Sequence, residues 1–206
     1  MEVEGGVLRY PVALSTESRP HRTERNSFLP FLSSSGEPAR PVLPKSLPAS
    51  REFERQRLRS LERSGLLDSG DDERFDRLTR KACAQFKVST AIISLLDADR
   101  QYLKSFVGSF PRNLRRDEAF CNVTIVGEDL LVVPDLRADE RFRDNPLVVG
   151  EPFVRFYAGV PLRGPGGWFV GSMCILDTMP RELHGREQER LRRLADEVEL
   201  EMNTRR

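Results

Sequence analysis

The sequence predicts an α+β fold: a central antiparallel sheet flanked by helices and preceded by a leader outside the domain. Residues 155–162 and 171–177 are apolar runs typical of buried strands. The turn 163–167 between them contains three glycines and a proline, so the chain can reverse at once and pair the two runs. Segments before and after the predicted strands carry apolar residues at helical spacing, among them residues 186–202 at the end of the chain. At 206 residues, the chain can hold one domain of roughly 150 residues and a tail.

Composition narrows the classes of partner. Lysine and arginine number 33 against 32 aspartates and glutamates, so no whole-protein field attracts nucleic acid or an anionic membrane. The three cysteines, Cys83, Cys121 and Cys174, are an odd number among apolar neighbours, which favours reduced thiols over a disulfide framework. We find no secretory signal and no apolar stretch of membrane-spanning length. These observations predict a cytoplasmic protein that contacts neither nucleic acid nor membrane.

Residues 1–50 differ in character from the rest of the chain. They hold half of the 14 prolines together with the run 33–35 of serines, and their apolar residues are not periodic. Ordering them would cost about 1–2 kcal/mol of backbone entropy per residue with little burial in return. We therefore predict a disordered leader, with a docking or phosphorylated tail as the alternative.

Two helices are predicted before the first strand. The first begins at Arg51 and ends at Gly65, a residue type that suits the end of a helix. The second follows Asp71 and Asp72, either of which can cap it. Its apolar face comprises Phe75, Leu78, Ala82 and Phe86.

The remaining elements follow in order from the same signals. Residues 90–96 and 100–106 are predicted to form a hairpin around the turn 97–99. The rest comprises a short helix over 117–126, a strand over 130–133, a lid over 135–152 with one helical turn, the closing hairpin, and an amphipathic helix over 186–202. The last helix is expected to pack on the first helix or on its twin in a dimer.

Several short runs are informative because of their order. They are Gly65–Asp68, Glu73–Thr79, Ile93–Gln101, Lys104–Ser105, Ala119–Cys121, Val133–Asp135, Arg141–Leu147 and the two closing strands. Over residues 52–202 this series resembles a GAF domain, a PAS-like module that senses small molecules. The branch it resembles lies at the amino end of histidine kinases and diguanylate cyclases. The resemblance implies a GAF domain over 51–206, with its core at about 72–202, that acts in signal transduction without catalysis.

The sequence departs from the family at positions that bind known ligands. The branch usually has a histidine where this chain has Val123, and the two histidines here are His21 and His184. The cysteine-histidine pair of bilin-binding members and the cyclic-nucleotide signature are both missing. Bilin, cyclic GMP and a histidine-held metal are therefore not expected, and the cofactor and ligand are left unidentified.

A ligand cup is predicted between the sheet, the 117–126 helix and the lid. Cups of this kind combine an apolar wall with a few convergent polar groups. The candidate ligand-binding residues are Phe120, Cys121, Asn122, Thr124, Asp135, Phe142, Asn145, Arg155 and Tyr157. As alternatives, Asp135, Asp144 and Asn145 only turn the loop, or Asp135 pairs with Arg155.

The sequence is also compatible with two other functions, a reductase and a dimerisation module. Some GAF proteins resemble free methionine-(R)-sulfoxide reductase, and a function of this kind predicts that Cys121 pairs with Cys83 or Cys174 during turnover. A dimerisation module predicts a vestigial cup filled by side chains. The expected partners are an unknown small molecule and, through the terminal helices, a second copy of the chain or a signalling protein.

Overall fold

The computed structural model describes residues 51–204, and the predicted leader 1–50 lies outside them. The elements are α1 (Arg51–Ser64), α2 (Glu73–Phe86), β1 (Thr90–Leu96), β2 (Arg100–Val107), β3 (Asn113–Arg115), the 3-10 turn η1 (Arg116–Glu118), α3 (Cys121–Thr124), β4 (Leu131–Val133), α4 (Pro146–Val149), β5 (Phe156–Arg163), β6 (Phe169–Asp177) and α5 (Gly185–Asn203). Among these elements, no helix is both long enough and apolar enough to cross a membrane.

The sheet has six strands in the order β3-β2-β1-β6-β5-β4, and every neighbouring pair is antiparallel. The two predicted hairpins, β1–β2 and β5–β6, are confirmed. They meet through β1 and β6, which places Cys174 opposite Ile92 on one side and Gly159 on the other. The predicted α+β class is therefore confirmed.

The glycine turn forms as its composition requires. Gly166 and Gly167 have φ of +85° and +82°, a backbone region that residues with a Cβ rarely adopt. The capping prediction also holds, since the Asp72 side chain accepts a hydrogen bond from the backbone N–H of Arg74 at the start of α2. These local signals fix where the chain turns.

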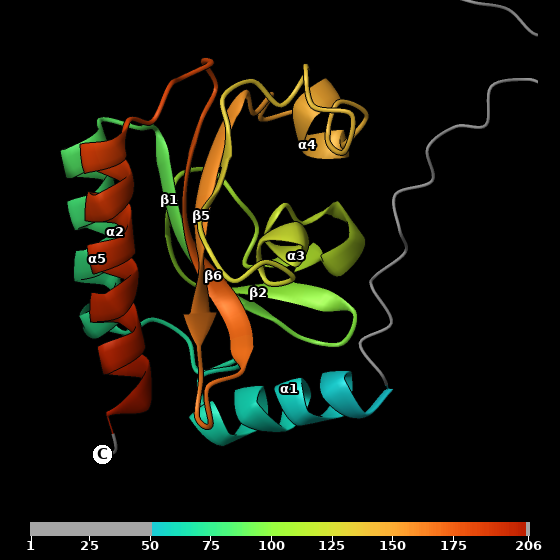
Figure 1. The fold of residues 1–206 in the computed structure, drawn as a ribbon, viewed down its shortest axis with the longest axis vertical. Helices are drawn as coiled ribbons and strands as arrows, with labels where there is room; N and C mark the ends of the chain where they lie inside the picture. Colours follow the sequence, from blue (N-terminus) through green and yellow to red (C-terminus); the bar gives the residue numbers. More distant parts are fainter. Residues whose placement is uncertain (1–50, 205–206) are drawn as a thin grey trace, which may run out of the picture. The chain divides into compact units, whose positions relative to one another are not determined.

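Helices α2 and α5 lie side by side on one face of the sheet (Figure 1). Lys81 of α2 pairs with Glu197 of α5 at 2.6 Å, and Arg77 pairs with Glu201 at 2.5 Å. The expectation that the last helix packs on the first is therefore wrong, because its apolar stripe is buried against the sheet beside α2. Helix α1 instead packs against the β5–β6 turn, where Ser60 Oγ donates to the carbonyl of Pro165.

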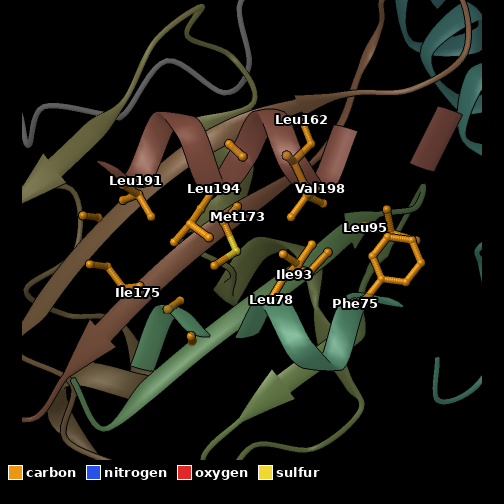
Figure 2. Close-up of a cluster of buried hydrophobic side chains, with 14 of the residues drawn as sticks. Phe75, Leu78, Ile93, Leu95, Leu162, Met173, Ile175, Leu191, Leu194 and Val198 are labelled. Carbon is orange, nitrogen blue, oxygen red and sulfur yellow. The ribbon is translucent and has the colours of Figure 1, made fainter. Parts of the chain in front are cut away.

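Beneath α2 and α5 lies a continuous apolar cluster, which we call the helix-side core (Figure 2). The side chains that Figure 2 labels in it are Phe75, Leu78, Ile93, Leu95, Leu162, Met173, Ile175, Leu191, Leu194 and Val198. They come from the helix stripes and from alternate positions of the central strands, because successive strand residues point to opposite faces.

The short helix predicted over 117–126 is in fact divided. Residues 116–118 form η1, Ala119 has an extended backbone at φ −79° and ψ 122°, and α3 is only the four residues Cys121–Thr124. The edge strand β3 was not predicted, because its three residues are too few to show alternation. The predicted lid is confirmed as a loop with one helical turn, α4.

Candidate functional site

The face of the sheet opposite the helix-side core is covered by α3, α4 and the loops around them (Figure 1). A second apolar cluster, which includes Phe120, Cys121, Phe142, Tyr157 and Cys174, fills this space, and we call it the cup-side core. It leaves a cavity of about 10 Å³ beneath α3, lined among others by Gln101, Cys121, Tyr157 and Cys174. Such a cavity has room for about one water molecule, whereas metabolite pockets measure roughly 300–1,000 Å³. The cup is thus filled by its own side chains in this structure.

Aromatic rings do most of the filling. The Phe120 ring lies 5.4 Å from that of Phe142 in an edge-to-face arrangement and 5.4 Å from that of Tyr157. All three rings are buried. Such pairs add about 0.5–1.5 kcal/mol each beyond the area that they bury. The rings predicted as ligand-binding walls therefore contact one another.

The Tyr157 hydroxyl has two partners at the centre of the cup. It lies 2.6 Å from Thr124 Oγ1 and donates to Cys121 Sγ at 3.5 Å. Burial raises the pKa of Tyr157 well above its usual value, so the phenol keeps its proton. Gly159 makes room for this ring, since a Cβ there would lie 2.3 Å from Tyr157 Oη.

Two thiols meet in the same place. Cys121 Sγ on α3 and Cys174 Sγ on β6 are 3.7 Å apart, and both side chains are buried. The hydrogen bond from Cys174 lowers the pKa of Cys121 despite its burial, while burial raises the pKa of Cys174. Cys121 is therefore the thiol of the pair that loses its proton first.

Cys83 lies elsewhere, on α2, where it is half-buried and packs against the helix-side core. Burial raises its pKa. Of the two pairings that the reductase hypothesis offered for Cys121, the structure brings together only the one with Cys174.

A chain of polar contacts leads from α3 to α1. Arg116 donates through Nε to Asn122 Oδ1 of α3 at 2.9 Å and through Nη1 to Glu54 Oε1 of α1 at 2.6 Å. The buried Arg57 donates to the same Glu54 oxygen at 2.7 Å. Partial burial raises the pKa of Glu54, but hydrogen bonds from Arg57 and Arg116 outweigh it and bring the pKa to about 2. Glu54 thus remains charged between two guanidinium groups.

The polar residues of the lid satisfy local backbone groups. Asn145 caps α4 by accepting from Leu147 N, and its Nδ2 donates to the carbonyl of Glu118. Arg155 donates to the carbonyl of Val148 at 2.8 Å. The Asp135 carboxylate accepts from Arg137 rather than from Arg155. A ligand role for these side chains stays a prediction.

Sequence reasoning missed one residue of the cup. Gln101 of β2 is 2% exposed, lines the cavity, and has an Oε1 that accepts no hydrogen bond from the residues the structure describes. Its position two residues before the buried Leu103 was the available signal, because both then point to the same face of the sheet. Within residues 51–204, we find no group of three or more His, Cys, Asp or Glu side chains that could hold a metal ion.

Comparison with known proteins agrees with this architecture. The model of the family described as GAF domain matches residues 72–202. The chain belongs to the GAF domain family. Membership in this family implies a regulatory or sensory domain.

One curated relative of this GAF domain is "Cyclic di-GMP phosphodiesterase PA2567" of Pseudomonas aeruginosa strain PAO1. It is 40% identical over 134 residues, which are 65% of this chain and 23% of the relative. The chain therefore spans less than a quarter of the length of that protein.

Solved structures share the fold. The GAF domain of an Acinetobacter phosphoenolpyruvate-protein phosphotransferase aligns with a TM-score of 0.51 at 18% identity, covering 71% of this chain and 92% of the other. A type II free methionine-R-sulfoxide reductase of Thermoplasma acidophilum aligns with a TM-score of 0.53 at 14% identity, covering 63% and 90%. At these identities the likeness shows the fold alone.

Proposed function

We propose that this GAF domain is a non-catalytic signalling domain that relays a change in the cup beneath α3 to helix α1. The observation that carries the proposal is the contact chain Asn122–Arg116–Glu54–Arg57, which joins the cap of the cup to a terminal helix. Arg57 also donates to the carbonyl of Leu96 at the end of β1, so α1 is tied to the sheet at the same point.

The filled cup represents the ligand-free state in this proposal. A small molecule would enter by displacing α3 and the lid, which are short elements, rather than the sheet. Opening would separate Phe120 from Phe142 and Tyr157 and turn these faces toward the ligand. It would also move Asn122 away from Arg116. Arg116 would then be free to shift relative to Glu54, and the ion pair that holds α1 would weaken. Binding that favours the open arrangement would shift the population of α1 states accordingly.

The curated relative suggests the kind of output. Its name says that it acts on cyclic di-GMP, and the stretch resembling this chain is a minor part of it. We propose that this chain likewise regulates a cytoplasmic catalytic domain, through a homodimer or a signalling partner at its terminal helices. Ligand identity stays open, because the cup offers generic apolar and hydroxyl groups.

Hydrogen exchange of the full chain tests the relay. Asn122→Ala removes the acceptor on α3, so we expect faster amide exchange across residues 51–64 than in the unchanged protein. Asn203→Ala is the matched control, since that amide donates to the carbonyls of Arg163 and Glu199 at the far end of α5. Unchanged exchange of α1 in Asn122→Ala would contradict the relay.

Native mass spectrometry of the full chain, purified from its own host, tests the ligand. We expect a retained small molecule of constant mass that is released on unfolding. A protein mass without addition, in a dimer, would instead favour the dimerisation module with a vestigial cup, which the 10 Å³ cavity already supports.

A reductase of free methionine sulfoxide is the second candidate, favoured by the neighbouring thiols of Cys121 and Cys174. Its substrate has the size of an amino acid and would require the cup to open. Turnover of free methionine-(R)-sulfoxide with a dithiol reductant, lost in Cys121→Ser, would establish it. No turnover would leave the regulatory function.

A further inference from the structure

The cup holds a buried dithiol and a buried hydrogen-bond acceptor around one small cavity. Cys121, Cys174 and Gln101 all line it, from α3, β6 and β2 respectively. Neither the relay to α1 nor the family membership uses these groups.

The acceptor restricts the guest. A buried amide oxygen without a hydrogen bond destabilises the fold, so a small molecule that donates an O–H or N–H to Gln101 Oε1 is stabilised there. In the closed arrangement of this structure, the volume of about 10 Å³ admits a molecule the size of water and is too small for an amino acid or a nucleotide. The cavity is also lined by three half-buried side chains, Phe110, Leu114 and Leu147. Because these side chains are able to move outward, the cavity can expand to hold a molecule one oxygen atom larger than water.

We propose that Cys121 and Cys174 form a peroxide-responsive thiol pair, with hydrogen peroxide held beside them through a hydrogen bond to Gln101. Hydrogen peroxide is one oxygen larger than water and carries two O–H donors. It is also a two-electron oxidant, which is what two thiols need to become a disulfide.

The surroundings of Cys121 favour its role as the attacking sulfur. The Tyr157 hydroxyl donates to Cys121 Sγ, and Thr124 Oγ1 in turn lies within hydrogen-bond distance of that hydroxyl. Thr124 can donate to the phenol oxygen while the phenol donates to sulfur, so both hydroxyls stabilise a thiolate. The lowered pKa of Cys121 and the raised pKa of Cys174 agree with this assignment.

The reaction balances with peroxide as the only co-reactant. The Cys121 thiolate attacks one peroxide oxygen, the O–O bond breaks, and the departing hydroxide takes up the proton that Cys121 gave up, leaving water and Cys121 sulfenic acid. Cys174 sulfur then attacks the sulfenic sulfur, an S–S bond forms, the S–O bond breaks, and the departing hydroxide takes the Cys174 proton as a second water. One peroxide is reduced to two waters, and two thiols are oxidised to one disulfide.

The geometry allows the second step with a small movement. The sulfurs are 3.7 Å apart, and a disulfide bond needs about 2.05 Å, so α3 and β6 must close by about 1.7 Å. β6 lies at the centre of the sheet, whereas α3 is four residues long between η1 and a loop. The movement therefore falls on α3.

Peroxide titration of the reduced full chain, followed by thiol alkylation and mass spectrometry of an unreduced digest, tests the proposal. We expect a linked Cys121–Cys174 peptide while Cys83 stays alkylatable. Cys83→Ser is the matched control and should leave the link unchanged, whereas Cys121→Ser and Cys174→Ser should each abolish it. Oxidation of Cys83 first, or of Cys121 without linkage to Cys174, would overturn the pair.

Gln101→Met, which keeps the volume and removes the acceptor, tests the peroxide site. We expect the link to form roughly tenfold more slowly than in the unchanged chain. A second comparison uses the unchanged chain and so does not depend on the folding of Gln101→Met. We expect cumene hydroperoxide to form the link more slowly than hydrogen peroxide by a similar factor, because the cavity is too small for the aromatic group. Equal rates in either comparison would overturn the peroxide site.

Discussion

The two faces of the sheet are built from the same strands but are covered differently. The helix-side core lies under two helices of 14 and 19 residues, and the polar side chains buried on that face include Thr79 of α2 and Ser105 of β2, whose hydroxyls are 2.9 Å apart. The cup-side core lies under helices of four residues, and its face of the sheet also buries polar side chains, namely Ser94, Gln101 and Ser172. The two faces therefore differ chiefly in the length of the helices that cover them.

This difference follows from what each cover can bury. A long amphipathic helix presents a continuous apolar stripe to a sheet and excludes water along its length. Short helices and loops present no stripe of that length, and the sheet beneath them also buries paired polar groups, such as the Ser94 and Ser172 hydroxyls 3.1 Å apart. Regions of that kind open at lower free energy than packed helices do.

The largest expected effect comes from truncating one leucine on each face, a buried one on the helix side and a half-buried one on the lid. Leu194→Ala in the helix-side core should lower the free energy of unfolding by ~2–5 kcal/mol, because it leaves a cavity in rigid surroundings. Leu147→Ala, on the half-buried lid, should cost about 1 kcal/mol, since the site is open to solvent and can collapse. Urea unfolding of the two variants measures this. Equal losses would break the comparison between the faces.

A second prediction concerns the buried hydroxyls of the cup. Tyr157→Phe leaves Thr124 Oγ1 without its 2.6 Å partner and should cost about 1–3 kcal/mol. Adding Thr124→Val should cost less than the sum of the two single changes, because the partner of the lost hydroxyl is then removed as well. Chemical unfolding of the two single variants and the double variant completes the cycle. Additive losses would show that the two hydroxyls do not interact.

A third prediction uses the pH dependence of Glu54. Its pKa in the folded chain is about 2 and its ordinary value is 4.5, so its stabilisation is complete above about pH 4.5 and is lost as the pH falls toward 2. Because the carboxylate is partly exposed, solvent screening should keep the effect at about 1 kcal/mol or less. Between pH 4.5 and pH 2, the unfolding midpoint of Glu54→Gln should therefore decrease less than that of the unchanged chain. Parallel pH profiles of the two proteins would count against the contact between α1 and the cup.

The smallest effect is expected at the surface of the helix side. Lys81 and Glu197 join α2 to α5, but both side chains are about 40% exposed. Glu197→Gln should cost about 0.2–1 kcal/mol, and the loss should shrink in high salt. Unfolding at low and high ionic strength measures it. A loss as large as that of Leu194→Ala would mean that charges, rather than the apolar stripe, hold the two helices.

Local signals accounted for most of the fold. The glycines of the β5–β6 turn, Asp72 at the start of α2 and the apolar stripes of the long helices each act within a few residues, so the sequence displays them directly. The helix predicted over 117–126 was wrong in extent because the extended backbone at Ala119 reflects how the segment docks on the sheet. Of the two neighbours predicted for the terminal helix, the first helix was wrong for a similar reason, since an apolar stripe fits any apolar surface, and the twin in a dimer stays a prediction.

The sequence alone determined the two hairpins, the three long helices and most of the side chains near the cup, but neither the edge strand β3 nor Gln101. Only the tertiary structure decided that Cys121 and Cys174, 53 residues apart in the chain, lie in contact and that aromatic rings fill the cup. The physical reason is distance along the chain. Turns and stripes arise from neighbours in sequence, whereas the thiol pair depends on the β1–β6 register and on the docking of a four-residue helix, which are set by the packing of the whole domain.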